Sequence, residues 1–157
     1  MNIQDLMTAA AELELVAAKL YDTLADVSAD ETLTRALRAI SNDEVCHANA
    51  LSVGKKVHQE GPDVFSRINM EEEEIQQGIQ EGTGFRAELK SGFDLTEGLK
   101  KMIELERRFE RIHINTSIKI TNPSLKRLFE ALTKGDRSHI ITLNRLINMR
   151  EKQGYPA

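Results

Sequence analysis

Apolar residues recur every three or four positions along most of this chain, which is the spacing of one face of an α-helix. Helix-stopping and helix-capping residues interrupt the pattern and divide it into four long segments. We predict helices over about residues 3–26, 29–59, 95–120 and 123–153. The predicted fold class is therefore all-α, a four-helix bundle.

Capping signals mark where these helices begin. Ser28 with Glu31 three residues later matches a capping box, in which the serine accepts a backbone amide and the glutamate reaches back. Asp94 can cap the third long helix, and Asn122 followed by Pro123 fits an N-cap with a first-turn proline. Each half of the chain is therefore predicted to be a helical hairpin with a short turn.

The connection between the two halves is too long for a simple turn. We predict one short surface helix within it, over residues 70–77, and a solvated face for its glutamates at 71–74 rather than a cation port. A long crossover lets the second hairpin lie beside the first in the reverse direction. The prediction is a single domain over residues 1–157, made of a hairpin at 3–60, a crossover at 61–95 and a hairpin at 96–153.

Composition narrows the class of protein. The chain has 157 residues, a net charge of −4 at pH 7 and one cysteine. It has no basic field for nucleic acid and cannot build a disulfide framework. It shows neither the basic start and apolar run of a signal peptide nor an apolar stretch of about 20 residues for a membrane span. We expect a cytoplasmic protein with no nucleic-acid or membrane partner.

One pattern of potential metal-binding residues occurs twice, offset by 92 positions. In the first half, Glu14 is followed by Tyr21 and then by Glu44 and His47. Adding 92 to each number gives, without a gap, Glu106, His113, Asp136 and His139. Each repeat unit is a hairpin that carries one lone carboxylate and one carboxylate-x-x-His pair. Two such hairpins predict a dinuclear metal site with the ligands Glu14, Glu44, His47, Glu106, Asp136 and His139.

These six side chains are predicted to converge in the core. The turn of each hairpin lies midway between its two carboxylates, so folding brings both to one level. The ligands also occupy core-facing stripes. The apolar members of the stripes are Met7, Ala10, Ala17 and Leu24; Leu33, Leu37, Ile40 and Leu51; and Leu125, Phe129, Leu132, Leu143 and Leu146.

Burying four carboxylates is expensive. Desolvating each ion costs several kcal/mol, and like charges repel further, against a net domain stability of roughly 5–15 kcal/mol. The stripes carry no lysine or arginine, so we expect poor internal pairing. Two divalent cations would cancel the charge.

Several neighbouring residues have open roles. Tyr21, two turns after Glu14, is either a hydrogen-bond donor to a ligating carboxylate or a core aromatic, and His113 occupies the equivalent place. Glu110, one turn after Glu106, is a possible extra ligand. We expect packing rather than redox chemistry for Cys46, and an exposed position for His58.

On these residues, the chain resembles the ferritin-like di-iron carboxylate superfamily and, within it, rubrerythrin-like proteins. The motifs are Glu14 with Tyr21, the Glu44–His47 pair, Glu106, and the Asp136–His139 pair. The resemblance implies that Glu14 and His47 serve one metal and that Glu106 and His139 serve the other. Glu44 and Asp136 would bridge the two.

The chain departs from the family's pattern in three respects. Asp136 replaces the usual glutamate and is one methylene shorter. Phe109 stands where rubrerythrins carry an additional glutamate. No rubredoxin domain follows, so we expect an external electron-donor protein.

The resemblance implies a di-iron oxidoreductase that reduces hydrogen peroxide or dioxygen, with a role in oxidative stress, and a homodimer. Iron is the expected cofactor, with two ions per chain, and manganese or zinc would accept the same donors. Two alternatives stay open. One is a ferroxidase that handles iron, similar to bacterioferritin. The other is a non-catalytic metal-binding helical bundle.

Overall fold

The computed structural model describes residues 3–57, 69–152 and 154, and the side chains at 69–72 lie outside that description. All described secondary structure is helical. The elements are α1 (Ile3–Val27), α2 (Glu31–Val57), α3 (Asn69–Lys90), α4 (Leu95–Lys119) and α5 (Pro123–Lys152). No helix among these is long and apolar enough to cross a membrane.

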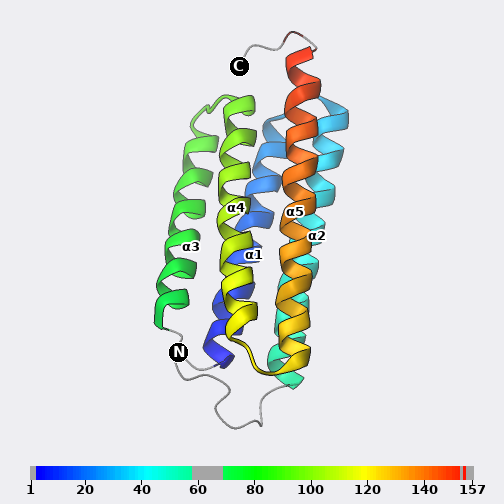
Figure 1. The fold of residues 1–157 in the computed structure, drawn as a ribbon. Helices are drawn as coiled ribbons and strands as arrows, with labels where there is room; N and C mark the ends of the chain where they lie inside the picture. The colour runs from blue at the N-terminus through cyan, green and yellow to red at the C-terminus, as the bar shows by residue number, and fades with distance from the viewer. Residues whose placement is uncertain (1–2, 58–68, 153, 155–157) are drawn as a thin grey trace.

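The helices form an elongated bundle in which successive elements alternate in direction (Figure 1). The most extensive packing is between α1 and α2 and between α4 and α5, the two hairpins predicted from the sequence. Helix α4 runs opposite to α1, so the second hairpin is reversed relative to the first (Figure 1). Helix α3 packs on α1 and α4 and lies along one side of the bundle (Figure 1). The prediction of an all-helical bundle is confirmed.

Two of the predicted helix starts are confirmed and one is wrong. The Asp94 side chain accepts the Glu97 amide at 2.9 Å at the start of α4. Asn122 accepts the amides of Ser124 and Leu125 before α5. At the start of α2, however, the cap is Asp30, whose Oδ1 accepts the Leu33 amide at 3.0 Å. The Ser28 hydroxyl accepts the Asp30 amide instead, so the capping-box prediction is wrong. The predicted end of this helix at residue 59, with its Gly61–Pro62 stop, falls outside the described residues.

The connecting helix differs most from the prediction. Instead of a short surface helix over residues 70–77, α3 has 22 residues. Its side chains Ile75, Phe85 and Leu89 are buried against the bundle. Gly82 permits this close packing, because a Cβ there would lie 2.6 Å from Val16 Cγ1 of α1. The glycines of this segment lower its helix propensity, and tertiary packing compensates for them.

The predicted core stripes are buried. Their largest fully buried members include Leu24, Leu37 and Phe129. The hairpin α1–α2 is also joined by the Ser41 hydroxyl, which donates to the Ala18 carbonyl at 3.0 Å. Among the described residues, the buried acids lie near the middle of their helices, where the candidate site is.

Candidate metal centre

Four helices each send one carboxylate into the middle of the bundle. Glu14 comes from α1, Glu44 from α2, Glu106 from α4 and Asp136 from α5, and none is more than 1% exposed. Buried carboxylates occur rarely unless they are paired or bind a metal. The sequence prediction that these acids share the core is therefore confirmed by their burial.

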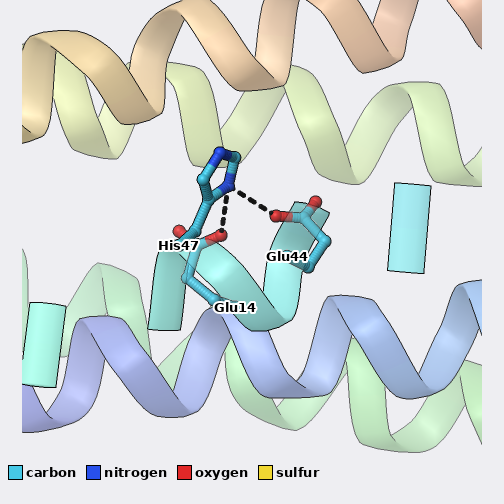
Figure 2. Close-up of side chains that lie close together, drawn as sticks. All are labelled: Glu14, Glu44 and His47. Atoms are coloured by element: carbon cyan, nitrogen blue, oxygen red, sulfur yellow. Dashed lines mark hydrogen bonds and ion pairs between the residues drawn. The ribbon is translucent and has the colours of Figure 1, made fainter. Parts of the chain in front are cut away.

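The first potential metal-binding group consists of Glu14, Glu44 and His47. His47 Nδ1 lies 2.9 Å from Glu44 Oε2 and 3.3 Å from Glu14 Oε2. Figure 2 shows the imidazole edge turned toward both carboxylates, which come from two different helices. One nitrogen and two oxygens thus converge in an arrangement that could hold a cation.

The second group consists of Glu44, Glu106 and His139. His139 Nδ1 lies 3.0 Å from Glu44 Oε1 and 3.5 Å from Glu106 Oε1. In each group the potential ligand atoms all lie within 4.8 Å of one another. Glu44 belongs to both groups and offers a different oxygen to each histidine, which is the geometry of a bridging carboxylate.

Asp136 belongs to neither group. Its Oδ2 lies 2.8 Å from Nδ1 of His113, a residue that is fully buried. The opposite ring nitrogen, Nε2, lies 3.1 Å from Glu14 Oε1. His113 therefore links Asp136 to Glu14, and the structure does not place Asp136 in the bridging position that the resemblance implies. The shorter side chain of aspartate accounts for this, since it ends one methylene earlier.

Tyr21 makes the equivalent contact from the first hairpin to the second. Its hydroxyl donates to Glu106 Oε1. Tyr21 and His113 are repeat counterparts, and so are Glu106 and Glu14. Each hairpin thus reaches from the same repeat position to the lone glutamate of the other hairpin. Of the two open roles for Tyr21, the structure supports the hydrogen-bond donor.

The histidines supply positive charge that the sequence analysis did not anticipate. Burial opposes protonation of His47, but contacts with Glu14 and Glu44 outweigh it and raise its pKa to about 10. The same balance raises the pKa of His113, beside Asp136 and Glu14, to about 10. In the same way, Glu106 and Glu44 raise that of His139 to about 11. The expectation of poor internal pairing is wrong, because it considered only lysine and arginine.

The carboxylates respond differently to this environment. Burial raises the pKa of Glu44 well above its ordinary value, and the charges of Glu106 and Glu14 raise it further. Burial also raises the pKa of Asp136, to about 6, against the opposing effect of His113. For Glu14, burial is outweighed by the contacts with His113 and His47, so its pKa is lowered. Glu44, which both groups share, is therefore harder to ionise than an exposed glutamate.

The internal pairing nevertheless leaves polar atoms unsatisfied. Among the described residues, five buried side-chain atoms have no hydrogen-bond partner, and all five belong to this cluster. They are Glu14 Oε1, Glu44 Oε1, Glu106 Oε2, His113 Nε2 and His139 Nδ1. Four of them face one another in two ion pairs that are not aligned as hydrogen bonds, His113 Nε2 with Glu14 Oε1 at 3.1 Å and His139 Nδ1 with Glu44 Oε1 at 3.0 Å. An unsatisfied buried polar atom costs about 1–3 kcal/mol, and more when charged. Oxygen and imidazole donors of this kind fit a first-row transition metal.

Two further residues considered in the sequence analysis, Glu110 and Cys46, lie outside the cluster. Glu110 belongs to neither group, and its carboxylate pairs with Arg137, so the structure does not bring this possible extra ligand into the site. Cys46 is exposed, so the expectation that packing explains this residue is wrong. His58 lies outside the described residues.

One feature of the site was missed in the sequence, although a comparison of the repeats contains the signal. His113 was recognised as the counterpart of Tyr21, and only its role was left open. Gly135 is the counterpart of Asp43, and this is where the repeat breaks next to the ligands. A Cβ at Gly135 would lie 2.4 Å from His47 Cε1, whereas Asp43 Oδ2 lies 3.8 Å from His139 Nε2.

Comparisons with known proteins identify no relative. No family model matches the chain, and neither a curated protein nor a solved structure shows significant similarity to it. The functional argument therefore rests on the residues and their geometry.

Proposed function

We propose that the chain is a dinuclear metal protein of the ferritin-like type, and that with two iron ions it reduces hydrogen peroxide or dioxygen. The observation that carries the proposal is the convergence of three buried carboxylates and two histidines in two overlapping groups, Glu14–Glu44–His47 and Glu44–Glu106–His139. In each group the potential ligand atoms lie within 4.8 Å of one another. Several of the close contacts within the cluster are ion pairs that are not aligned as hydrogen bonds.

Each residue of the cluster has a part in this proposal. Glu14 and His47 would hold one ion, Glu106 and His139 the other, and Glu44 would bridge them. Tyr21 would fix the orientation of Glu106, and His113 that of Glu14, since hydrogen-bonded neighbours orient metal ligands and tune their basicity. Asp136 would hold His113 in place. The surrounding apolar side chains would exclude bulk water from the cluster.

Iron in this setting would supply the electrons for reduction of the oxidant. The carboxylate ligands would stabilise ferric iron, and the imidazole ligands would increase the affinity for the metal. Turnover would require re-reduction by a separate electron-donor protein. That donor, a homodimeric state and a cytoplasmic location remain predictions.

Metal analysis tests the proposal. Protein loaded anaerobically with ferrous iron is expected to retain about two irons per chain and, after oxidation, to absorb in the near ultraviolet. Glu44→Gln keeps the shape of the side chain but removes the shared ligand, so it is expected to lose both irons. Glu104→Gln removes the same charge from the exposed surface of α4 and is the matched control.

Activity is measured on the same preparations. Hydrogen peroxide consumption per iron should exceed that of free iron and should disappear in Glu44→Gln. A wild-type protein that retains two irons yet consumes peroxide no faster than free iron would exclude the peroxide-reducing role and leave the ferroxidase alternative. Failure to retain any first-row metal would exclude the metal centre itself.

A further inference from the structure

The two hairpins meet along two long interfaces, which we call the α1/α4 seam and the α2/α5 seam. The two seams are covered differently. Helix α3 packs along α1 and α4, and none of the described helices packs in the same way on α2 and α5 (Figure 1). Helices α2 and α5 also contact each other less extensively than either contacts its own hairpin partner. The α2/α5 seam is therefore the thinner wall between the carboxylate cluster and solvent.

The two histidines of the metal-binding groups form this wall. Their ring centroids are 5.7 Å apart. The His47 side chain is 19% exposed, whereas that of His139 is 4% exposed and those of the carboxylates are at most 1% exposed. His47 is thus the point at which the cluster comes closest to the surface.

The residue opposite His47 on α5 is Gly135, which has no side chain. The imidazole occupies the space that Gly135 leaves on α5, since an added Cβ would lie 2.4 Å from Cε1 and 2.7 Å from Nε2. Glycine in the middle of a helix is unfavourable by roughly 0.5–1 kcal/mol relative to alanine. Here it lets the His47 ring, which contacts Glu14 and Glu44, pack directly against α5.

The repeat counterpart of this position is occupied by a charge. Asp43 is 67% exposed and lies beside His139, with 3.8 Å between Oδ2 and Nε2. A carboxylate at the mouth of the seam raises the local concentration of cations. The break in the repeat thus places a glycine beside His47 and a carboxylate beside His139.

We propose that divalent cations reach the carboxylate cluster through the α2/α5 seam, attracted by Asp43 and passing the His47 ring over Gly135. This inference rests on the proposed metal centre. It assigns Asp43 and Gly135 roles in loading that are separate from holding the ions.

The rate of Co²⁺ uptake tests this route. The chain has no tryptophan and two tyrosines, so in a Tyr155→Phe background the fluorescence of Tyr21, which contacts Glu106, reports on the cluster. Binding of Co²⁺ should quench it, and stopped-flow mixing gives the rate. Equilibrium titration of each variant separately gives the affinity and the number of ions bound.

The first pair of variants tests the gap. His47→Ala and His47→Phe both remove the imidazole ligand, so both should bind the same number of ions through Glu44, Glu106 and His139. Only alanine uncovers the space over Gly135, whereas phenylalanine keeps it filled. We expect Co²⁺ to load at least about five-fold faster in His47→Ala than in His47→Phe. Equal rates would overturn the route through this gap.

The second pair tests the charge at the mouth. Asp43→Asn and Glu104→Gln each remove one exposed carboxylate, on α2 and α4 respectively, and Glu104 borders the groove between α3 and α4. Asp43→Asn should slow uptake about two- to five-fold at low ionic strength, with unchanged stoichiometry, and the difference should vanish in high salt. Equal slowing by both variants would overturn the role of Asp43. If the wild type binds no Co²⁺ at equilibrium, the metal centre fails rather than the route.

Discussion

At the residue scale, the centre depends on contacts that cross between hairpins. Tyr21 of the first hairpin holds Glu106 of the second, and His113 of the second lies against Glu14 of the first. Because these pairs are repeat counterparts, the two halves constrain each other's lone carboxylate in the same way. The chemistry differs, however, since one contact is a neutral hydroxyl and the other an imidazole whose pKa is raised to about 10.

Tyr21→Phe is expected to destabilise the metal-free protein by about 1–3 kcal/mol, because it leaves Glu106 Oε1 without its hydroxyl donor. Urea unfolding of chelator-treated protein measures the change. Tyr155→Phe removes the same atom elsewhere in the chain and is the control. Equal unfolding free energies for Tyr21→Phe and wild type would contradict the assigned hydrogen bond.

The geometry and the family resemblance imply different roles for Asp136. Because Asp136 contacts His113 and belongs to neither metal-binding group, we expect Asp136→Asn to retain about two irons per chain. A bridging aspartate would instead make the variant lose at least one iron. Elemental analysis of the variant beside wild type and Glu44→Gln decides between these outcomes.

The sequence predicted the burial of the four acids, because the offset of 92 aligns whole stripes as well as single residues. It could not predict which carboxylate each histidine contacts, since that depends on side-chain length and rotamer. Asp136 and Glu44 are repeat counterparts, yet Glu44 reaches both groups and Asp136 reaches neither. A difference of one methylene is invisible to a pattern of spacing.

At the scale of elements, α3 shows where local propensity fails. Three glycines, at positions 78, 82 and 84, lower its helix propensity, but packing on α1 and α4 stabilises a helix of 22 residues. The starts of α4 and α5 were predictable because a side-chain cap is a local interaction. The cap of α2 was not, because Ser28 and Asp30 both had suitable side chains and only the path of the turn selects between them.

Two glycines of α3 give opposite predictions. Gly84→Ala should stabilise the protein by up to about 1 kcal/mol, because the added Cβ meets nothing within 4 Å and improves helix propensity. Gly82→Ala should destabilise it by about 1–3 kcal/mol, because its Cβ would lie 2.6 Å from Val16 Cγ1. Thermal and urea unfolding measure both. Stabilisation by both variants would show that α3 does not pack against α1 at Gly82.

At the scale of the whole molecule, the buried carboxylate charge can be offset in two ways. Protonated histidines offset it in the metal-free protein, and cations offset it in the metal-bound protein. Without ions, three imidazoles with raised pKa values offset the buried carboxylates incompletely. With ions, His47 and His139 must be neutral to act as ligands, so binding releases protons. Protons and metal ions therefore compete for the same histidine nitrogens.

This competition predicts opposite pH dependences. In metal-free protein the histidine contribution to stability is complete below the ordinary pKa of 6.5 and is lost as pH rises through about 10, the folded-state pKa of His47. Urea midpoints of metal-free protein should therefore fall between pH 6.5 and 8.5. The affinity for Co²⁺ should rise over the same range. A metal-free protein whose stability increases with pH, at constant ionic strength, would contradict the assigned ion pairs.

The central claim is that three buried glutamates, Glu14, Glu44 and Glu106, and two histidines form one dinuclear metal centre. A crystal structure of iron-loaded protein, with anomalous data collected at the iron edge, tests it most directly. We predict two peaks, one among Glu14, Glu44 and His47 and the other among Glu44, Glu106 and His139. Intact histidine–carboxylate pairs with no anomalous peak in the bundle, from crystals grown in excess iron, would contradict it.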